Sequence, residues 1–180
     1  MTRTTKTAYL ALGSNQGDRE KHIERALAAL TAAGIAVRRR SPLYETQPVG
    51  TAAQRWFLNC VLEVETELMP LALLRAAQRI ERQLGRHPAV VPQPVARTID
   101  IDILFYGTSV VRLAELTIPH PRLAERRFVL APLCDLAPEL RHPLTRKTVA
   151  EMLAGLTDRA TVRRWSRQRR GWPAKQRPQV

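Results

Sequence analysis

The sequence predicts an α+β fold whose elements follow the order strand, helix, strand, strand, helix, strand. Residues 57–67 and 98–103 place apolar side chains at every second position, which is the pattern of a strand with one buried face. Residues 18–34 and 70–85 instead repeat apolar side chains three and four positions apart, as an amphipathic helix does. This order is the ferredoxin-like βαββαβ arrangement, an antiparallel sheet with both helices on one face. Short C-terminal helices are expected after it.

The first half of the chain begins with a short apolar strand at 7–12, followed by a polar turn that contains two glycines. Asp18 is placed to cap the first helix, which we expect to end near Gly34. Residues 35–44 are expected to form the second strand. A polar loop with one proline and one glycine then covers 45–55.

The third strand is expected at 57–67, where four alternate apolar side chains share one face. Pro70 follows and opens the second helix at a first-turn position, where a missing N–H group is tolerated. Gly85 is placed to end that helix. Residues 86–96 contain three prolines, so we expect a surface loop of a length that is often functional.

Two aspartates stand in the middle of the fourth predicted strand, although aspartate is a poor strand former. The isoleucines of 99–103 point into a core, so Asp100 and Asp102 point to the opposite face. Carboxylates two residues apart on a strand are separated by roughly 6.5–7 Å. That spacing suits a platform for two hard cations bridged by substrate phosphates, although a solvated face on an antiparallel sheet remains the alternative.

The last third of the chain contains shorter predicted elements. A return strand is expected near 110–113, and the prolines of 118–121 favour an extended segment. Residues 122–133 are expected to become helical, and 148–156 to form a last short helix.

The net charge of +13 is unusual, and its distribution is uneven. Residues 159–180 hold eight basic residues and no acidic one, and subtracting those eight leaves +5 for residues 1–158. We therefore expect a single domain over 1–158 and a basic, flexible tail over 159–180. A moderately basic body suits an anionic small substrate, whereas an arginine-rich tail either binds nucleic acid or serves as a solubilising extension.

The two cysteines, Cys60 and Cys134, lie in apolar stretches. This usage suits a reducing compartment and no disulfide framework. The sequence shows no signal peptide and no apolar run of membrane-spanning length. We expect a cytoplasmic monomer without a membrane partner.

Seven motifs in order along the chain resemble those of the 6-hydroxymethyl-7,8-dihydropterin pyrophosphokinase family of the folate pathway. They occupy residues 11–15, 41–46 with 48–50, 57–59, 78–86, 97–104, 116–122 and 126–133. Each motif alone is short, but seven in sequence at compatible spacing are specific.

The resemblance implies transfer of pyrophosphate from ATP to the hydroxymethyl group of the pterin, which releases AMP. It implies two Mg²⁺ ions held by Asp100 and Asp102, and a catalytic group made of these aspartates with Arg86 and Arg97. The implied ATP-binding residues are Gln78, Arg86, Arg97, Ile103, Thr117, His120 and Arg126. The implied pterin-binding residues are Thr46, Val49, Phe57, Asn59 and Phe128, whose two aromatic rings would stack on the flat heterocycle.

The chain departs from this family mainly in the loop before the aspartate strand. That loop usually carries further arginines and ends in Trp-Gly-Pro-Arg, whereas residues 87–96 have no arginine, lysine or tryptophan and only Arg97 is kept. Pro121 also stands where an aromatic residue is common. Two alternatives therefore stay open: a divergent paralogue that binds pterin or nucleotide with little turnover, and a ferredoxin-like nucleic-acid-binding domain. The sheet lacks the aromatic pair that RNA-binding sheets use, so nucleic acid is the less favoured partner.

Overall fold

The structure, a computed structural model, describes residues 4–47, 55–85, 97–158 and 160–166. Its main sheet has the strand order β5-β1-β4-β3-β8, with β2 also paired to β4, and every pair is antiparallel. The strands are β1 (Lys6–Ser14), β2 (Ala36–Arg40), β3 (Tyr44–Thr46), β4 (Phe57–Thr66), β5 (Asp100–Tyr106) and β8 (Val162–Arg164). The predicted α+β class and the order of its strands and helices are confirmed.

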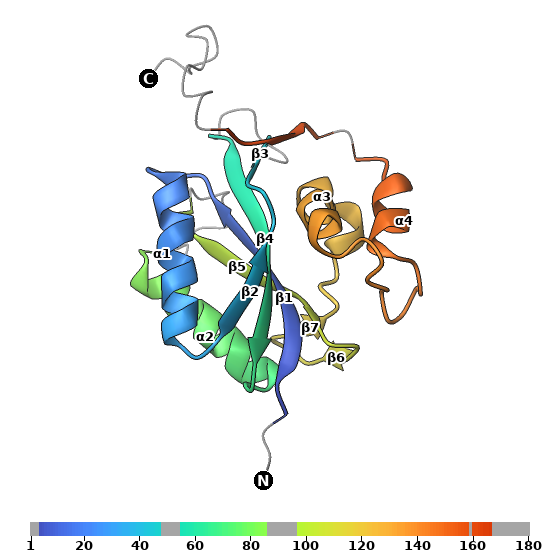
Figure 1. Ribbon diagram of the computed structural model, residues 1–180, viewed down its shortest axis with the longest axis horizontal. Coiled ribbons are helices and arrows are strands. Elements are labelled where there is room, and N and C mark those ends of the chain that lie inside the picture. Colours follow the sequence, from blue (N-terminus) through green and yellow to red (C-terminus); the bar gives the residue numbers. More distant parts are fainter. Residues whose placement is uncertain (1–3, 48–54, 86–96, 159, 167–180) are drawn as a thin grey trace, which may run out of the picture.

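The two long helices, α1 (Arg19–Ala32) and α2 (Pro70–Gln83), cover one face of this sheet (Figure 1). Asp18 caps α1, since its side chain accepts a hydrogen bond from the backbone N–H of Lys21. The core under these helices includes the alternate apolar residues of β4 and β5, among them Leu62 and Ile101. The two helices lie on the face on which they were predicted, because the strands present one of their two alternating sets of side chains to them, and that set is apolar.

The opposite face of the sheet is covered by the C-terminal helices α3 (Arg127–Leu136) and α4 (Val149–Ala154) (Figure 1). A second core lies beneath them, in which Val61 of β4 and Phe105 of β5 pack with apolar residues of both helices. The 3₁₀ turn η1 (Leu123–Glu125) leads into α3, and a small hairpin of β6 (Val111–Arg112) and β7 (Thr117–Ile118) precedes it.

The strand predicted over 35–44 is divided into β2 and β3, and the physical cause lies at Ser41 and Pro42. The Ser41 hydroxyl accepts a hydrogen bond from the N–H of Val61, which takes the place of a backbone carbonyl in the ladder. Pro42 has no N–H to donate, so regular pairing stops there and resumes at β3.

Residues 162–164 differ from the flexible tail that the sequence predicted. They form β8, which pairs with β3 through Tyr44 opposite Arg164 and Thr46 opposite Val162. This segment has one apolar residue, Val162, among polar neighbours, so it shows no hydrophobic periodicity. Its strand conformation comes instead from pairing with an edge strand of the sheet. Residues 167–180 lie outside the described residues. In the part of the chain that is described, no helix is long and apolar enough to cross a membrane.

Candidate active site

Polar residues from three strands, with a glycine of a fourth strand between two of them, line up across one end of the sheet. The register places Asp100 of β5 opposite Gly13 of β1, Gly13 opposite Asn59 of β4, and Asn59 opposite Tyr44 of β3. One step along, Asp102 lies opposite Ala11. Because paired residues of neighbouring strands point to the same face, the aspartates and Asn59 project together to the side that carries α3.

A cavity of about 750 Å³ opens over this row of residues. Its floor includes Asp100, Asp102 and Asn59, and its far side is formed by residues of η1, α3 and 155–158. The volume lies within the range of pockets that bind small organic molecules. Four of the five predicted pterin-binding residues line it: Thr46, Phe57, Asn59 and Phe128. Val49, the fifth, lies outside the described residues.

The polar part of this cavity is held by one short hydrogen bond. The Asn59 Nδ2 atom donates to the Thr46 Oγ1 atom at 2.6 Å, and both residues are buried. A Cβ atom at Gly13 would lie only 2.6 Å from the Asn59 Oδ1 atom, so glycine leaves the space that the amide occupies. Two aromatic side chains, Phe57 and Phe128, and an oriented amide are what recognition of a flat polar heterocycle requires.

Asp100 and Asp102 lie among basic side chains. Arg97 donates through Nη1 to the Asp100 carboxylate at 2.5 Å. The Asp102 Oδ2 atom is 3.8 Å from Arg126 Nη1 and 4.0 Å from His120 Nε2. Burial raises the pKa of Asp102, and the negative charge of Asp100 raises it further. The Asp102 side chain keeps 40% of its surface open to the cavity, so the group is enclosed by protein yet accessible to a ligand.

His120 is oriented by backbone contacts on both sides. The backbone N–H of His120 donates to the carbonyl of Leu104 in β5 at 3.0 Å. The Nδ1 atom of its ring accepts from the backbone N–H of Arg122 at 3.2 Å. Burial lowers the pKa of His120, the largest effect on this ring. The neutral ring therefore carries its proton on Nε2, which faces Asp102.

Two further polar residues hold the aspartate strand in place. Glu81 of α2 is buried and accepts a hydrogen bond at 2.7 Å from the N–H of Ile101, the residue between the aspartates. Asn15, in the turn after β1, accepts from the N–H of Arg97 at 2.6 Å and donates its own N–H to the Arg97 carbonyl. Both residues lie in the family-like sequence motifs, and the sequence alone assigns a role to neither.

A second, smaller pocket of about 270 Å³ lies on the other side of Asp102. Ile103, Thr117 and His120, all predicted to bind ATP, line it together with Asp102. Gln78 does not line it, but this exposed side chain stands one helical turn after Leu74, which does. Asp102 is thus shared by both pockets.

The comparisons with known proteins agree with this geometry. The sequence model of the 7,8-dihydro-6-hydroxymethylpterin-pyrophosphokinase (HPPK) family matches residues 9–138. The 2-amino-4-hydroxy-6-hydroxymethyldihydropteridine pyrophosphokinase of Bacillus subtilis is 42% identical over 159 residues, which cover 88% of this chain and 89% of that protein. The chain belongs to the HPPK family.

Other relatives of this HPPK family member are longer proteins. The folic acid synthesis protein fol1 of Schizosaccharomyces pombe is 46% identical over 149 residues, which cover 82% of this chain but only 20% of that protein. A crystal structure of Plasmodium falciparum HPPK-DHPS with pteroate superposes with a TM-score of 0.68 at 17% identity, over 84% of this chain and 44% of that one. The chain thus spans about a fifth of the length of the fungal relative, and the structural match supports the fold.

The HPPK-like site also contains residues that the sequence did not single out, and one that the structure does not describe. Gln47, Arg122 and residues 155–158 line the larger cavity. Arg122 ends the motif 116–122, which gave it no role, and no local pattern marks Gln47 or residues 155–158, which reach the cavity through the strand order and through the path of the chain after α4. Arg86, predicted to bind ATP, lies outside the described residues, as does the loop 87–96.

The carboxylates of this HPPK family member fit a magnesium site by their chemistry. Among the described residues, no group of three or more histidine, cysteine, aspartate or glutamate side chains gathers to hold a metal ion. Mg²⁺ does not need such a cage, since it is typically bound by one or two carboxylates together with substrate phosphates and water. Asp100 and Asp102 stand two residues apart on one face of β5 and line the larger cavity together, which fits that mode of binding.

Proposed function

We propose that this chain transfers pyrophosphate from ATP to the hydroxymethyl group of 6-hydroxymethyl-7,8-dihydropterin, giving the pterin diphosphate and AMP for folate biosynthesis. The observation that carries the proposal is the position of Asp102, which lines both the larger cavity and the smaller pocket. A pterin in the first and ATP in the second would therefore meet at the aspartates. The relatives named as pyrophosphokinases, which match over most of their length, support the same reaction.

The pterin would lie in the larger cavity between Phe57 and Phe128. Stacking provides affinity without direction, so the Asn59 amide, held by Thr46, would fix how the ring lies. This arrangement would turn the hydroxymethyl group toward Asp100 and Asp102. Positioning of this kind provides much of the rate in phosphoryl-type transfer, in which the attacking and leaving oxygens lie roughly in line.

The triphosphate would lie among the basic side chains around the aspartates. Arg97 and Arg126 provide positive charge on either side, and the His120 Nε2–H provides a hydrogen-bond donor. Asp100 and Asp102 would hold two Mg²⁺ ions, which when bound neutralise phosphate charge as it develops. Gln78, Ile103 and Thr117 would contact the nucleotide, and Arg86 would add a further phosphate contact.

The test is whether the purified protein forms AMP from ATP only when the hydroxymethyldihydropterin and Mg²⁺ are both present. We expect one AMP for each pterin diphosphate formed. AMP formation without pterin would refute the proposed acceptor. Tight pterin binding with no AMP would favour the divergent, binding-only alternative that the altered loop 87–96 suggests.

The proposal also covers the oligomeric state and the cellular location of the protein. We propose that the protein acts as a monomer, which sedimentation equilibrium across a tenfold concentration range will measure. We also propose a cytoplasmic location, which suits the two free thiols, Cys60 and Cys134. Cell fractionation with an antibody to the chain would test it.

A further inference from the structure

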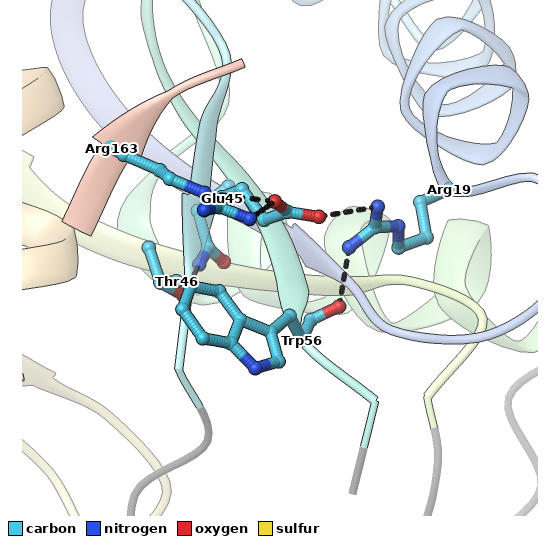
Figure 2. A network of polar contacts seen from close by, with 6 residues as sticks. Arg19, Glu45, Thr46, Trp56 and Arg163 are labelled. Atoms are coloured by element: carbon cyan, nitrogen blue, oxygen red, sulfur yellow. Dashed lines mark hydrogen bonds and ion pairs between the residues drawn. The ribbon is translucent and has the colours of Figure 1, made fainter. Parts of the chain in front are cut away.

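A buried carboxylate next in sequence to Thr46, a residue of the larger cavity, joins three elements that are distant in sequence. Glu45 of β3 has a side chain only 7% exposed. Arg19, at the start of α1, donates to its Oε1 atom at 2.8 Å, and Arg163 of β8 donates to its Oε2 atom through Nε at 3.1 Å and Nη2 at 2.7 Å. Figure 2 shows the two arginines reaching Glu45 from opposite sides.

The same two arginines also hold the residue that precedes β4. Arg19 donates to the Trp56 carbonyl at 2.6 Å, and the Arg163 guanidinium lies 4.8 Å from the centre of the Trp56 ring (Figure 2). Trp56 is followed by Phe57, and Glu45 is followed by Thr46. The network therefore fixes the neighbours of two cavity-lining residues without itself entering the cavity.

The next residue of β8 ties this strand to the other side of the cavity. Arg164 donates to Asp135 of α3 at 2.9 Å and to the Tyr44 hydroxyl at 3.2 Å, and that hydroxyl donates to Asp135 at 2.5 Å. Backbone bonds flank the contact, from Gln47 N–H to the Thr161 carbonyl and from Trp165 N–H to the Leu43 carbonyl. β8 thus links β3 to α3, which carry Thr46 and Phe128 on opposite sides of the cavity.

We propose that β8 positions the walls of the pterin cavity, with Arg163 and Arg164 as positioning residues. This inference rests on the proposed function for the identity of the ligand. A buried carboxylate needs countercharge, and Arg163 supplies two of the hydrogen bonds that keep Glu45 in place. Without it, β3 and Trp56 lose a shared contact, and the amide and aromatic groups beside them lose their alignment.

The test compares four variants, Arg163→Lys among them, with a matched control. Arg163→Met and Arg164→Met remove the guanidinium and keep much of the side-chain length, and truncation after Asp158 removes β8 altogether. Arg38→Met is the control, because Arg38 also donates through Nε and Nη2 to one carboxylate, that of Glu65, on an exposed part of β2. Two affinities are measured by equilibrium dialysis. One is that of a non-hydrolysable ATP analogue with Mg²⁺, and the other is that of hydroxymethyldihydropterin at saturating analogue.

We expect the pterin dissociation constant to rise about tenfold in Arg163→Met and Arg164→Met, the size expected for losing one charge-assisted contact. The affinity for the ATP analogue should stay within about twofold, because the smaller pocket contains no residue of β3 or β8. Arg163→Lys should recover part of the pterin affinity, since it restores charge but not the two-pronged contact. Arg38→Met should bind both ligands as the parent does.

Three results would overturn the inference. One is unchanged pterin affinity in both arginine variants. Another is equal weakening of pterin and ATP analogue, which would mean a general loss of structure. The third is a folded truncation with the pterin affinity of the parent. A parent protein that binds no pterin would instead refute the proposed function, so the two failures are distinguishable.

Discussion

At the scale of single residues, Asp102 shows how a site and a stable fold place opposite demands on one side chain. Its carboxylate is enclosed by protein, lies near a second carboxylate, and has a raised pKa for both reasons. Such a group does not help the unliganded protein, because neither Arg126 nor His120 reaches hydrogen-bonding distance. Its position makes sense when a cation and phosphates occupy the space beside it.

Asp102→Asn should therefore lower turnover by at least about a hundredfold, because the amide cannot replace the charge that would hold the proposed cation. The melting temperature without ligands should stay the same or rise, since a half-buried charge with a raised pKa is removed without changing the shape of the side chain. Single-turnover AMP formation and thermal unfolding measure the two effects. Asp18→Asn, at the cap of α1, is the matched control and should change neither. A melting temperature several degrees lower in Asp102→Asn would show that the carboxylate stabilises the fold.

Gly13 has a specific role in the larger cavity. Gly13→Ala would place a Cβ atom 2.6 Å from the Asn59 Oδ1 atom, so the amide must leave the position in which it bonds Thr46. We expect weaker pterin binding by about tenfold, from loss of one buried hydrogen bond, with unchanged affinity for the ATP analogue. Gly107→Ala is the control, because its strain at a φ of +51° lies in a turn outside both pockets and should affect stability alone. Equal pterin affinity in the two variants would contradict this role of Gly13.

At the scale of elements, α4 is short and depends on its first turn for stability. Its Thr148 side chain accepts from the N–H of Glu151 at 3.1 Å, and the Glu151 side chain accepts from the N–H of Thr148 at 2.7 Å. This reciprocal pair satisfies two backbone donors that a helix start leaves without intrahelical partners. Val149 and Met152 then anchor the helix in the second core, and the chain leaving α4 forms part of the larger cavity.

Thr148→Ala should lower the free energy of unfolding by about 1 kcal/mol, because the N–H of Glu151 loses the hydroxyl that accepts its hydrogen bond. Urea unfolding followed by circular dichroism gives this value. Thr31→Ala is the matched control: its hydroxyl bonds a carbonyl within α1 and is exposed, and alanine is the better helix former. We expect that variant to change stability by less than about 0.5 kcal/mol. Equal losses in both variants would show that the capping pair contributes nothing.

At the scale of the whole molecule, the net charge of +13 is shared between the folded body and the C-terminal end. Residues 167–180 hold five basic residues and no acidic one. Removing residues after Ser166 keeps β8 and deletes this charge, whereas cutting after Asp158 removes both. The domain boundary at residue 158 stays a prediction, but the pairing of β8 with β3 places 162–164 in the main sheet.

Truncation after Ser166 should leave AMP formation unchanged and should weaken binding to a random single-stranded oligonucleotide at low salt. Attraction between arginines and phosphates falls steeply with salt, so the full chain should lose this binding by about 0.2 M salt. Filter binding at several salt concentrations measures it, with heparin as a competitor that has charge but no bases. Tight binding that survives 0.2 M salt and resists heparin would revive the nucleic-acid alternative.

Much of the fold could be predicted because the relevant signals are local. The alternation around Ile101 and the helical spacing after Pro70 identified elements that the structure confirms. The division of the second strand was missed, since it depends on the Ser41 hydroxyl meeting Val61, twenty residues away in sequence. β8 was missed for a similar reason, because its few residues are ordered by a partner strand rather than by their own pattern.

By itself the sequence determined where the long strands and the two long helices form, and that Asp100 and Asp102 share the face opposite the isoleucines. It could do so because side-chain direction repeats with a fixed period along each element. The tertiary structure alone decided which of these residues meet: Arg19, Glu45 and Arg163 join across separations of 26 and 118 residues, and Asn59 reaches Thr46 beside Gly13. Strand order and register bring such residues together, and neither is encoded by any local period.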